Sequence, residues 1–284
     1  MRTQSRDTSP EAERVLIDLI RKAPISKRFG FVRSWTKTVV QSNRRSIQEL
    51  HPEANQEEIA HIYVSDHYGH MLADGLRIAL QKREITISKA PDLLAMMTPL
   101  AQAFERLTVS YYIRGAVAIS IYGMQRATLD LEIVANIHLK HVHPLLHLLT
   151  SEYYIDEKAM REAIQYNSSF SGIHTSSLLK FDVFLSENSE FNQEVYRRVR
   201  RYALVENGYP FSLASPEDIV LMQLERYRAD GQRADDQWND ILGVLKVQGM
   251  ELDFTYLQRK ATMLKIDDLL EGARSDAGLK EKEI

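Results

Sequence analysis

Residues 111–135, YYIRGAVAISIYGMQRATLDLEIVA, contain the strongest structural pattern of the chain. The pattern predicts a strand, a glycine turn at Gly115, a short amphipathic helix, a second turn and a second strand. The second strand carries Asp130 and Glu132. Because these two residues are two positions apart on an extended segment, their carboxylates point to the same face, roughly 6 to 7 Å apart along the backbone. This spacing can hold a divalent metal ion.

The acidic pair has a second interpretation, an edge strand whose polar face is exposed to water. Its apolar neighbours argue against this: Leu129, Leu131, Ile133 and Val134. They are typical of a mostly buried strand, where unpaired carboxylates would cost free energy. We therefore treat Asp130 and Glu132 as candidate site residues.

Composition limits the class of protein. The length of 284 residues and the apolar content of 44% predict about two domains with sizeable cores. No window approaches the roughly 18 apolar residues of a membrane span, and the N-terminus does not resemble a signal peptide. We therefore expect a cytoplasmic protein with no membrane partner. The absence of cysteine excludes disulfides and thiolate metal ligands, and the net charge of −3 gives no global attraction to nucleic acid.

Helix signals divide the chain into three predicted parts. Residues 1–88 form an N-terminal all-helical module, with helix starts at Ser9-Pro10 and at Asn55, which has Glu58 three positions later. We assign this module to support or to binding a partner protein. Residues 89–210 form the core with the strands, and residues 211–284 form a C-terminal helical subdomain and tail that begins near Ser215-Pro216.

A third carboxylate lies in a later strand. Residues 179–185 alternate, with Leu179, Phe181, Val183 and Leu185 on one side and Lys180, Asp182 and Phe184 on the other. Asp182 is therefore a carboxylate within a hydrophobic strand. Further on, four arginines surround Val199: Arg197, Arg198, Arg200 and Arg201. They predict either a basic helix face or a clamp for a polyanion such as a triphosphate or RNA.

The order of these residues resembles a known pattern. Gly115-Ala116 is followed after 13 residues by Asp130-Leu131-Glu132-Ile133, and later by Phe181-Asp182-Val183. This set resembles the polymerase-beta-like nucleotidyltransferase superfamily. More narrowly, it is similar to small bacterial nucleotidyltransferases related to abortive-infection and antitoxin proteins. The resemblance covers residues 95–273 and includes the segments 215–218 and 237–241.

The resemblance implies an α+β fold, in which a small mixed β-sheet is joined to the C-terminal helical subdomain. It also implies magnesium-dependent transfer of a nucleoside monophosphate from a nucleoside triphosphate to an acceptor hydroxyl. The resemblance implies an acceptor of one of two kinds, the end of an RNA or a hydroxyl of a partner protein, and the sequence does not choose between them. Two Mg²⁺ ions are expected, as in other two-metal phosphoryl transfers. Asp130, Glu132 and Asp182 are then both the catalytic residues and the metal ligands.

The resemblance assigns nucleotide binding to Gly115, Ala116 and Arg126. A structural salt bridge is an equal alternative for Arg126. Two positions depart from the pattern: Ala116 lacks a phosphate-binding hydroxyl, and Gln223 stands where related proteins usually have lysine. These departures lead to an alternative function, a protein of this fold that has lost turnover and acts by binding in a toxin–antitoxin or defence pair. A third hypothesis is a scaffold assembled through residues 9–84.

Overall fold

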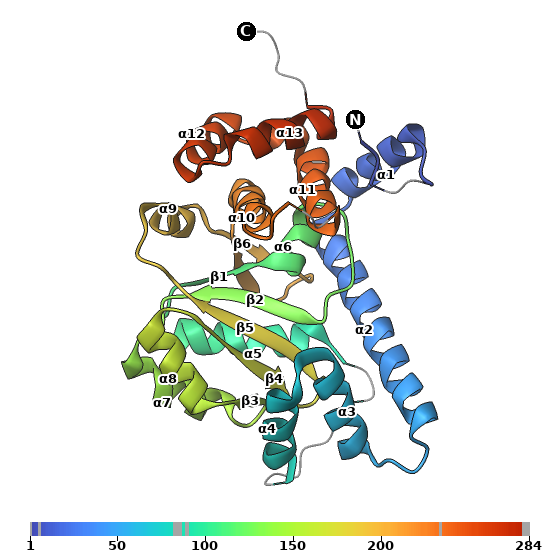
Figure 1. Cartoon of the computed structure of the whole chain (residues 1–284), viewed down its shortest axis with the longest axis vertical. Coiled ribbons are helices and arrows are strands. Elements are labelled where there is room, and N and C mark those ends of the chain that lie inside the picture. Colours follow the sequence, from blue (N-terminus) through green and yellow to red (C-terminus); the bar gives the residue numbers. More distant parts are fainter. Residues whose placement is uncertain (1, 5–6, 82–86, 89–90, 233–234, 280–284) are drawn as a thin grey trace. The chain divides into compact units, whose positions relative to one another are not determined.

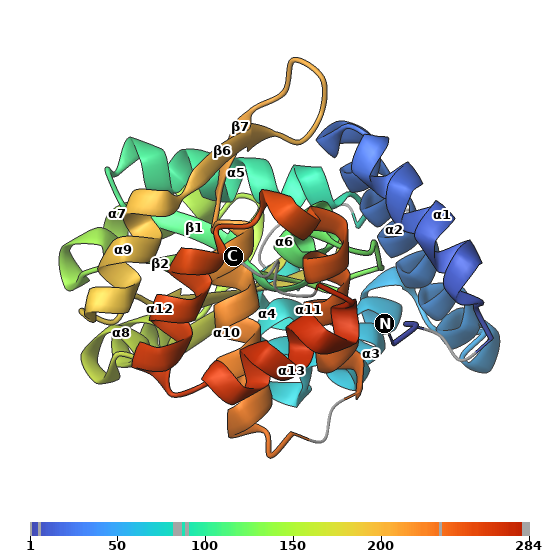
Figure 2. The same cartoon turned by 90° about the horizontal axis from the view of Figure 1, so that it is seen from above.

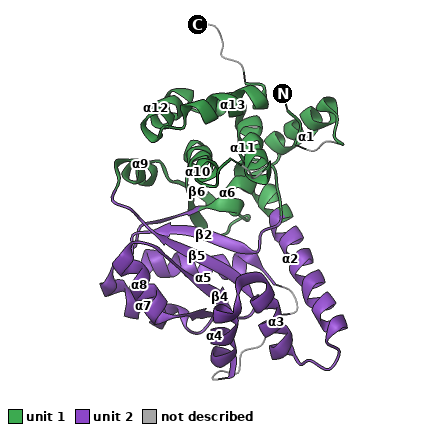
Figure 3. Ribbon diagram, in the orientation of Figure 1, with its two compact units in different colours: residues 1–31, 114–126, 189–284 green, residues 32–113, 127–188 purple. Residues whose placement is uncertain are grey.

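The computed structural model describes residues 2–4, 7–81, 87–88, 91–232 and 235–279. The chain forms two compact units (Figure 3). The first unit comprises residues 1–31, 114–126 and 189–284, and the second comprises residues 32–113 and 127–188. Each unit therefore combines segments that are distant in the sequence.

The second unit contains a mixed sheet with the strand order β3-β4-β5-β2-β1 (Figure 1). The strands are β1 (Tyr111–Arg114), β2 (Asp130–Ala135), β3 (Tyr153–Ile155), β4 (Ser169–His174) and β5 (Leu179–Leu185). The pair β2 and β5 is parallel, whereas β4 is antiparallel to both β3 and β5. This arrangement confirms the predicted α+β class with a mixed sheet.

The predicted alternation of β5 is also confirmed. Its odd-numbered residues from Leu179 to Leu185 are buried, and its even-numbered residues are partly exposed. In β2, Asp130 and Glu132 are partly exposed and the other four residues are buried. One face of this strand pair therefore belongs to the core, and the other presents the charged residues.

The helices of the second unit are α3 (Gln56–Tyr68), α4 (His70–Gln81), α5 (Leu93–Arg106), α7 (Val142–Leu149), α8 (Glu157–Tyr166), the 3₁₀ turn Leu139–His141, and α2 (Ile25–Leu50) from Val32 onward. The predicted capping box is present, because Asn55 and Glu58 bond to each other's backbone at the start of α3. The helix α4 lies close to the sheet at Gly75, where an added Cβ would be 1.8 Å from the Tyr154 hydroxyl oxygen. Helices α3 and α4 thus belong to the compact unit that contains the sheet.

The first unit is mainly helical. Its elements are α1 (Pro10–Lys22), the start of α2, α6 (Gly115–Tyr122), α9 (Glu190–Arg198), β6 (Arg200–Ala203), β7 (Pro210–Leu213), α10 (Pro216–Ala229), α11 (Asp235–Gln248), the 3₁₀ turn Gly249–Glu251, α12 (Phe254–Leu264) and α13 (Asp267–Ala277). The strands β6 and β7 form an antiparallel pair. Helix α11 packs against α1, α6, α10 and α13. Helix α12 packs against α10, beside which it lies in Figure 2. The C-terminal helical part predicted from Ser215 onward therefore exists as helices of this unit.

A buried ion pair connects α1 to α11. Lys246 Nζ lies 3.1 Å from Glu13 Oε1 and 3.0 Å from Oε2, and both side chains are at most 2% exposed. Helix α1 therefore belongs to the unit of the C-terminal helices, although it stands at the start of the predicted module 1–88. The compact units do not follow the predicted boundaries after residues 88 and 210, and residues 89–90 lie outside the described residues.

Within the part of the chain that the structure describes, no helix combines the length and the apolar character needed to cross a membrane.

One buried histidine should make the stability of the second unit depend on pH. His174 ends β4 and is 3% exposed, and its Nδ1 atom lies 2.7 Å from the Ser177 hydroxyl oxygen. Burial lowers the pKa of His174 to about 4. Because the pKa in the unfolded chain is about 6.5, the folded protein favours the neutral ring. This contribution to stability is complete above pH 6.5 and is lost progressively as the pH falls from about 6.5 to about 4.

We therefore compare the wild type with His174→Gln, whose side chain does not titrate. Between pH 7.5 and pH 4.5, the free energy of unfolding of the wild type should fall by about 2 to 3 kcal/mol more than that of the variant. Urea denaturation followed by circular dichroism at both pH values measures this difference. His147→Gln removes an exposed histidine of α7 and should keep the wild-type dependence. An equal fall in the wild type and in His174→Gln would contradict the prediction.

Candidate active site

Four charged residues form a group on one face of the second unit's sheet, which we call the charged block: Asp130, Glu132, Lys180 and Asp182. In the parallel pair of β2 and β5, the Cα partner of Asp130 is Lys180 and that of Glu132 is Asp182. Alternate residues of a strand point to the same face, so these four side chains project together. The structure thus brings the three predicted acids onto neighbouring positions of one surface.

Both carboxylate oxygens of Asp182 have partners. The Ser171 hydroxyl on β4 donates to Oδ1 at 2.5 Å, and Lys180 Nζ lies 2.7 Å from Oδ2. The side chains of Asp182 and Lys180 are 14% and 21% exposed. Opposite charges attract more strongly in such a partly buried setting than in bulk water. Asp182 is therefore held in place by a hydroxyl on one side and an ammonium group on the other.

Asp130 is positioned by the loop that precedes β2. The Thr128 hydroxyl lies 3.1 Å from Asp130 Oδ1 and 2.9 Å from the Asp130 carbonyl oxygen, and it can donate to either one. The Thr128 backbone N–H donates to the hydroxyl of Thr36 on α2 at 3.0 Å, and Thr36 is itself buried. Helix α2 therefore fixes the point at which β2 begins.

An aromatic residue of α3 borders the same block. Lys180 Nζ lies 5.9 Å from the centre of the Tyr68 ring, at the outer range of a cation–π contact. The Tyr68 hydroxyl donates to the Leu129 carbonyl at 2.9 Å. Burial is the largest cause that raises the pKa of Tyr68 well above its usual value, and the negative charge of Asp130 acts in the same direction. Tyr68 therefore stays a neutral hydrogen-bond donor at physiological pH.

Lys180 is the residue of this site to which the sequence pattern assigned no role. The alternation of residues 179–185 already places Lys180 on the side of Asp182. That signal shows only that the two residues share a face. The register between β2 and β5 adds Asp130 as the partner of Lys180, and this register could not be derived from the sequence.

The charged block offers carboxylate oxygens, which are the type of ligand that magnesium prefers. In this structure, both oxygens of Asp182 already have partners, the Ser171 hydroxyl and the Lys180 ammonium group. Among the described residues, no group of three or more His, Cys, Asp or Glu side chains is arranged to hold a metal ion. The predicted metal-binding role of Asp130, Glu132 and Asp182 therefore stays a prediction.

The predicted nucleotide-binding residues belong to the first unit, whereas the three acids belong to the second. Gly115 begins α6 with a φ of 65°, a left-handed conformation that favours glycine. Ala116 follows it and is 8% exposed. All eight residues of α6 are buried, so the prediction that this helix is amphipathic is wrong.

Two roles were considered for Arg126, a contact with the nucleotide and a structural salt bridge, and the structure contains the salt bridge. Its Nε and Nη2 atoms lie 3.3 and 3.0 Å from the two carboxylate oxygens of Asp240 on α11. Burial raises the pKa of Asp240, and the positive charge of Arg126 partly opposes this shift. A contact between Arg126 and a phosphate stays a prediction.

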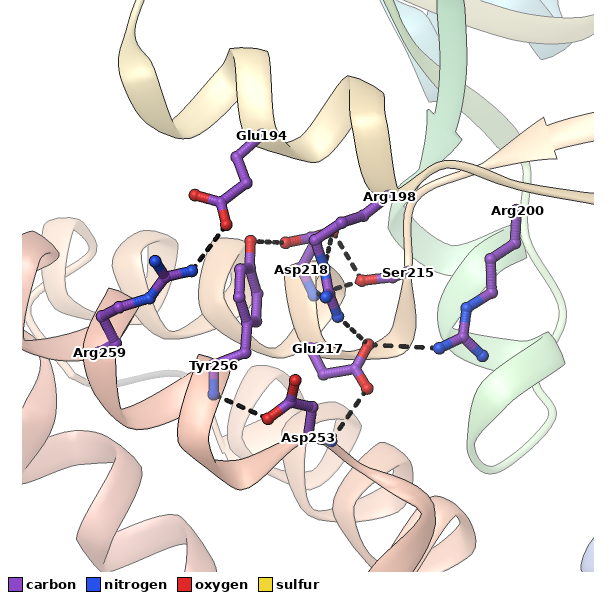
Figure 4. A network of polar contacts seen from close by, with 9 residues as sticks. All are labelled: Glu194, Arg198, Arg200, Ser215, Glu217, Asp218, Asp253, Tyr256 and Arg259. Atoms are coloured by element: carbon purple, nitrogen blue, oxygen red, sulfur yellow. Dashed lines mark hydrogen bonds and ion pairs between the residues drawn. The ribbon is translucent and has the colours of Figure 1, made fainter.

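Two of the four clustered arginines pair with a buried glutamate in the first unit (Figure 4). Glu217 lies in the first turn of α10 and is 1% exposed. Arg198 Nη2 donates to Glu217 Oε2 at 2.9 Å, and Arg200 Nη2 lies 3.7 Å from the same oxygen. The Asp253 backbone N–H donates to Oε1 at 3.1 Å. Glu217 thus joins the end of α9 and the start of β6 to the start of α12.

The neighbouring Asp218 is fully buried and accepts two hydroxyl hydrogen bonds. Ser215 donates to its Oδ2 and Tyr256 to its Oδ1, both at 2.6 Å (Figure 4). Burial raises the pKa of Asp218, and these hydrogen bonds partly oppose the shift. The Arg198 guanidinium lies 3.7 Å from the centre of the Tyr256 ring. For Arg198, the structure therefore favours a role inside the protein over a clamp for a polyanion.

The chain thus has an α+β fold with a mixed sheet. On one face of this sheet, the acid pair Asp130 and Glu132 lies beside a third acid, Asp182. No family model matches the sequence, and no curated protein matches it.

Two solved structures are similar in fold. One is an antigenic nucleotidyltransferase-like protein from Paracoccidioides brasiliensis, with a TM-score of 0.42 and 17% identity over 64% of this chain and 91% of that chain. The other is the antibiotic-resistance factor ANT(2'')-Ia, with a TM-score of 0.41 and 13% identity over 64% of this chain and 97% of that chain. These similarities concern the fold alone.

Proposed function

We propose that this chain is a magnesium-dependent nucleotidyltransferase, which transfers a nucleoside monophosphate from a nucleoside triphosphate to an acceptor hydroxyl. The observation that carries the proposal is the position of Asp130, Glu132 and Asp182 on one face of two adjacent parallel strands. The order of Gly115, the acid pair and the third acid along the sequence supports the same assignment.

In the proposed reaction, the acceptor oxygen forms a bond to the α-phosphorus of the triphosphate. The bond from this phosphorus to the pyrophosphate oxygen breaks, and pyrophosphate leaves with the electron pair. The proton of the acceptor hydroxyl passes to a base. Phosphoryl transfer of this kind depends on positioning and on neutralising charge rather than on covalent catalysis by the protein.

The charged block offers groups for these tasks. We assign the role of base to Asp182, which lies on the same face as Asp130 and Glu132. Asp130 and Glu132 complete the acidic surface that we propose for magnesium. Thr128 and Thr36 act as positioning residues, because they fix the start of the strand that carries this pair.

A labelling experiment tests this function. The protein is incubated with magnesium, cell extract and each of the four triphosphates labelled at the α-phosphate. We expect label to move to RNA or to protein, and digestion with ribonuclease or protease then identifies the class of acceptor.

The variant Asp130→Asn keeps the size of the side chain but removes its charge, so it should reduce the transfer by about tenfold or more. Asp66→Asn changes an exposed aspartate of α3 in the same unit and should transfer label like the wild type. If the wild type transfers no label, or if Asp130→Asn transfers as much as the wild type, the proposed activity is wrong.

A binding function without turnover is the second candidate, and the ion pair between Lys180 and Asp182 favours it. In that case the protein would act in a toxin–antitoxin or defence pair, as the resemblance also allows. Equilibrium dialysis with labelled triphosphates separates the two functions. Binding without transfer supports the second candidate, whereas transfer that depends on Asp130 supports the first.

A further inference from the structure

The charged block already contains a cation of its own. Lys180 lies two residues before Asp182 on β5, opposite Asp130 on β2. Its Nζ atom is 2.7 Å from Asp182 Oδ2, and its side chain is 21% exposed. An ammonium group therefore lies among carboxylates to which the sequence pattern assigned a metal ion.

We infer that Lys180 is the internal counter-cation of the charged block, and that a divalent metal ion binds there only by displacing its ammonium group from Asp182. This inference rests on the proposed function, because it concerns the same carboxylates. Three observations carry it. Lys180 forms an ion pair with Oδ2 of Asp182. The Ser171 hydroxyl donates a hydrogen bond to Oδ1 of the same residue. Among the described residues, no group of three or more His, Cys, Asp or Glu side chains is arranged to hold a metal ion.

The effect of Lys180 on metal affinity can be estimated from the charge of the block. The block holds three carboxylates and one ammonium group, so its formal charge is −2 with Lys180 and −3 without it. A charge within about 4 to 6 Å shifts a protonation equilibrium by about one to three units of pKa. The same attraction acts on a divalent ion. Removing the Lys180 charge should therefore raise the affinity of the block for such an ion by about tenfold or more.

The test measures metal binding without nucleotide and without turnover. Manganese is the probe, and the electron paramagnetic resonance signal of the free ion gives its Kd. The variant Lys180→Met keeps most of the aliphatic side chain and removes the charge, whereas Lys180→Arg keeps the charge. Lys158→Met removes a lysine of α8 that is 85% exposed, and it controls for the change in net charge. Circular dichroism melting curves establish that each variant is folded.

We expect Lys180→Met to bind manganese about tenfold or more tightly than the wild type. Lys180→Arg and Lys158→Met should bind like the wild type, and adding Asp182→Asn to Lys180→Met should remove the gain. Binding by the wild type with equal or weaker binding by Lys180→Met overturns the role of Lys180 and leaves the proposed metal site in place. Absence of binding by both proteins overturns the metal site itself.

A second measurement uses the wild-type protein, so it holds even if Lys180→Met does not fold. Lysine side chains are acetylated with and without manganese, and mass spectrometry quantifies the modification at each position. Displacement from Asp182 should increase the acetylation rate of Lys180 several-fold, while the rate of the exposed Lys158 serves as the reference. An unchanged rate for Lys180 at a manganese concentration that saturates the protein overturns the inference.

Discussion

Replacing Glu13 by alanine is expected to lower the free energy of unfolding by about 4 kcal/mol. The side chains of Glu13 and Lys246 are at most 2% exposed, and the two form a bidentate ion pair. Glu13 Oε1 also accepts the Gln4 backbone N–H at 2.8 Å. Without this carboxylate, the Lys246 ammonium keeps only the Arg2 carbonyl as a partner among the described contacts. A buried charge that has lost its counter-ion is costly, which explains the size of the effect.

Urea denaturation followed by circular dichroism measures the loss. The matched control is Asp18→Ala on the same helix, where Asp18 pairs with Lys22 and both side chains are more than half exposed. This control should cost less than about 1 kcal/mol. The double variant Glu13→Leu with Lys246→Met replaces the pair by apolar groups and should be more stable than Glu13→Ala. If Glu13→Ala costs no more than Asp18→Ala, the buried contact between α1 and α11 is wrong.

Glu217→Ala should lower the free energy of unfolding by about 3 to 4 kcal/mol. Glu217 is 1% exposed and is the acceptor for Arg198 Nη2 and for the Asp253 N–H. Its loss leaves a guanidinium group and a backbone donor at the start of α12 without their acceptor. Arg198 is 25% exposed, so water can reach it in part. For this reason the expected cost is somewhat smaller than that for Glu13.

The control for Glu217 lies in the same network. Arg259 is 64% exposed and pairs with Glu194 at 2.7 Å (Figure 4). Arg259→Ala removes the exposed partner of this pair, and Glu194 keeps Lys260 as a second cation, so the loss should be less than about 1 kcal/mol. Thermal melting and urea denaturation of both variants give the comparison. Similar losses for the two variants would mean that Glu217 does not join α9 and β6 to the start of α12 in the way described.

Local signals in the sequence predicted two helix starts and the strand that carries Asp182. The serine, proline and acid at Ser9 and at Ser215 start helices α1 and α10, and both serines accept a backbone N–H as N-caps. The alternation of residues 179–185 predicted β5 and the side on which Asp182 lies. Such signals depend on a few neighbouring residues, so they are readable without a structure.

Burial was harder to predict where a short segment lies in the interior. Helix α6 was expected to be amphipathic, yet every one of its residues is buried. In α4, the apolar residue Met71 is 89% exposed, whereas Ala73, Leu76 and Leu80 are buried. Hydrophobic spacing shows that a segment has an apolar face, but the number of elements around that segment decides how much of it is covered.

The partners of charged residues could not be derived from the sequence. Any of many acids could have paired with Lys246, and the actual partner, Glu13, is 233 residues away. The arginines around Val199 were compatible with a polyanion clamp, but Arg198 and Arg200 are directed to Glu217. Pairs of this kind form when elements that are distant in the sequence pack together, and the sequence pattern of one element does not specify them.

The sequence by itself determined that Asp130, Glu132 and Asp182 lie on strands, and that each strand presents its acids on one side. Alternation with a period of two residues is a local property, so it needs no partner strand. The tertiary structure decided that β2 and β5 are adjacent, parallel and in the register that sets Lys180 opposite Asp130. Register depends on hydrogen bonds between segments about 50 residues apart, and a shift of one residue would exchange their faces. That register is the physical reason why the three acids share their surface with a lysine.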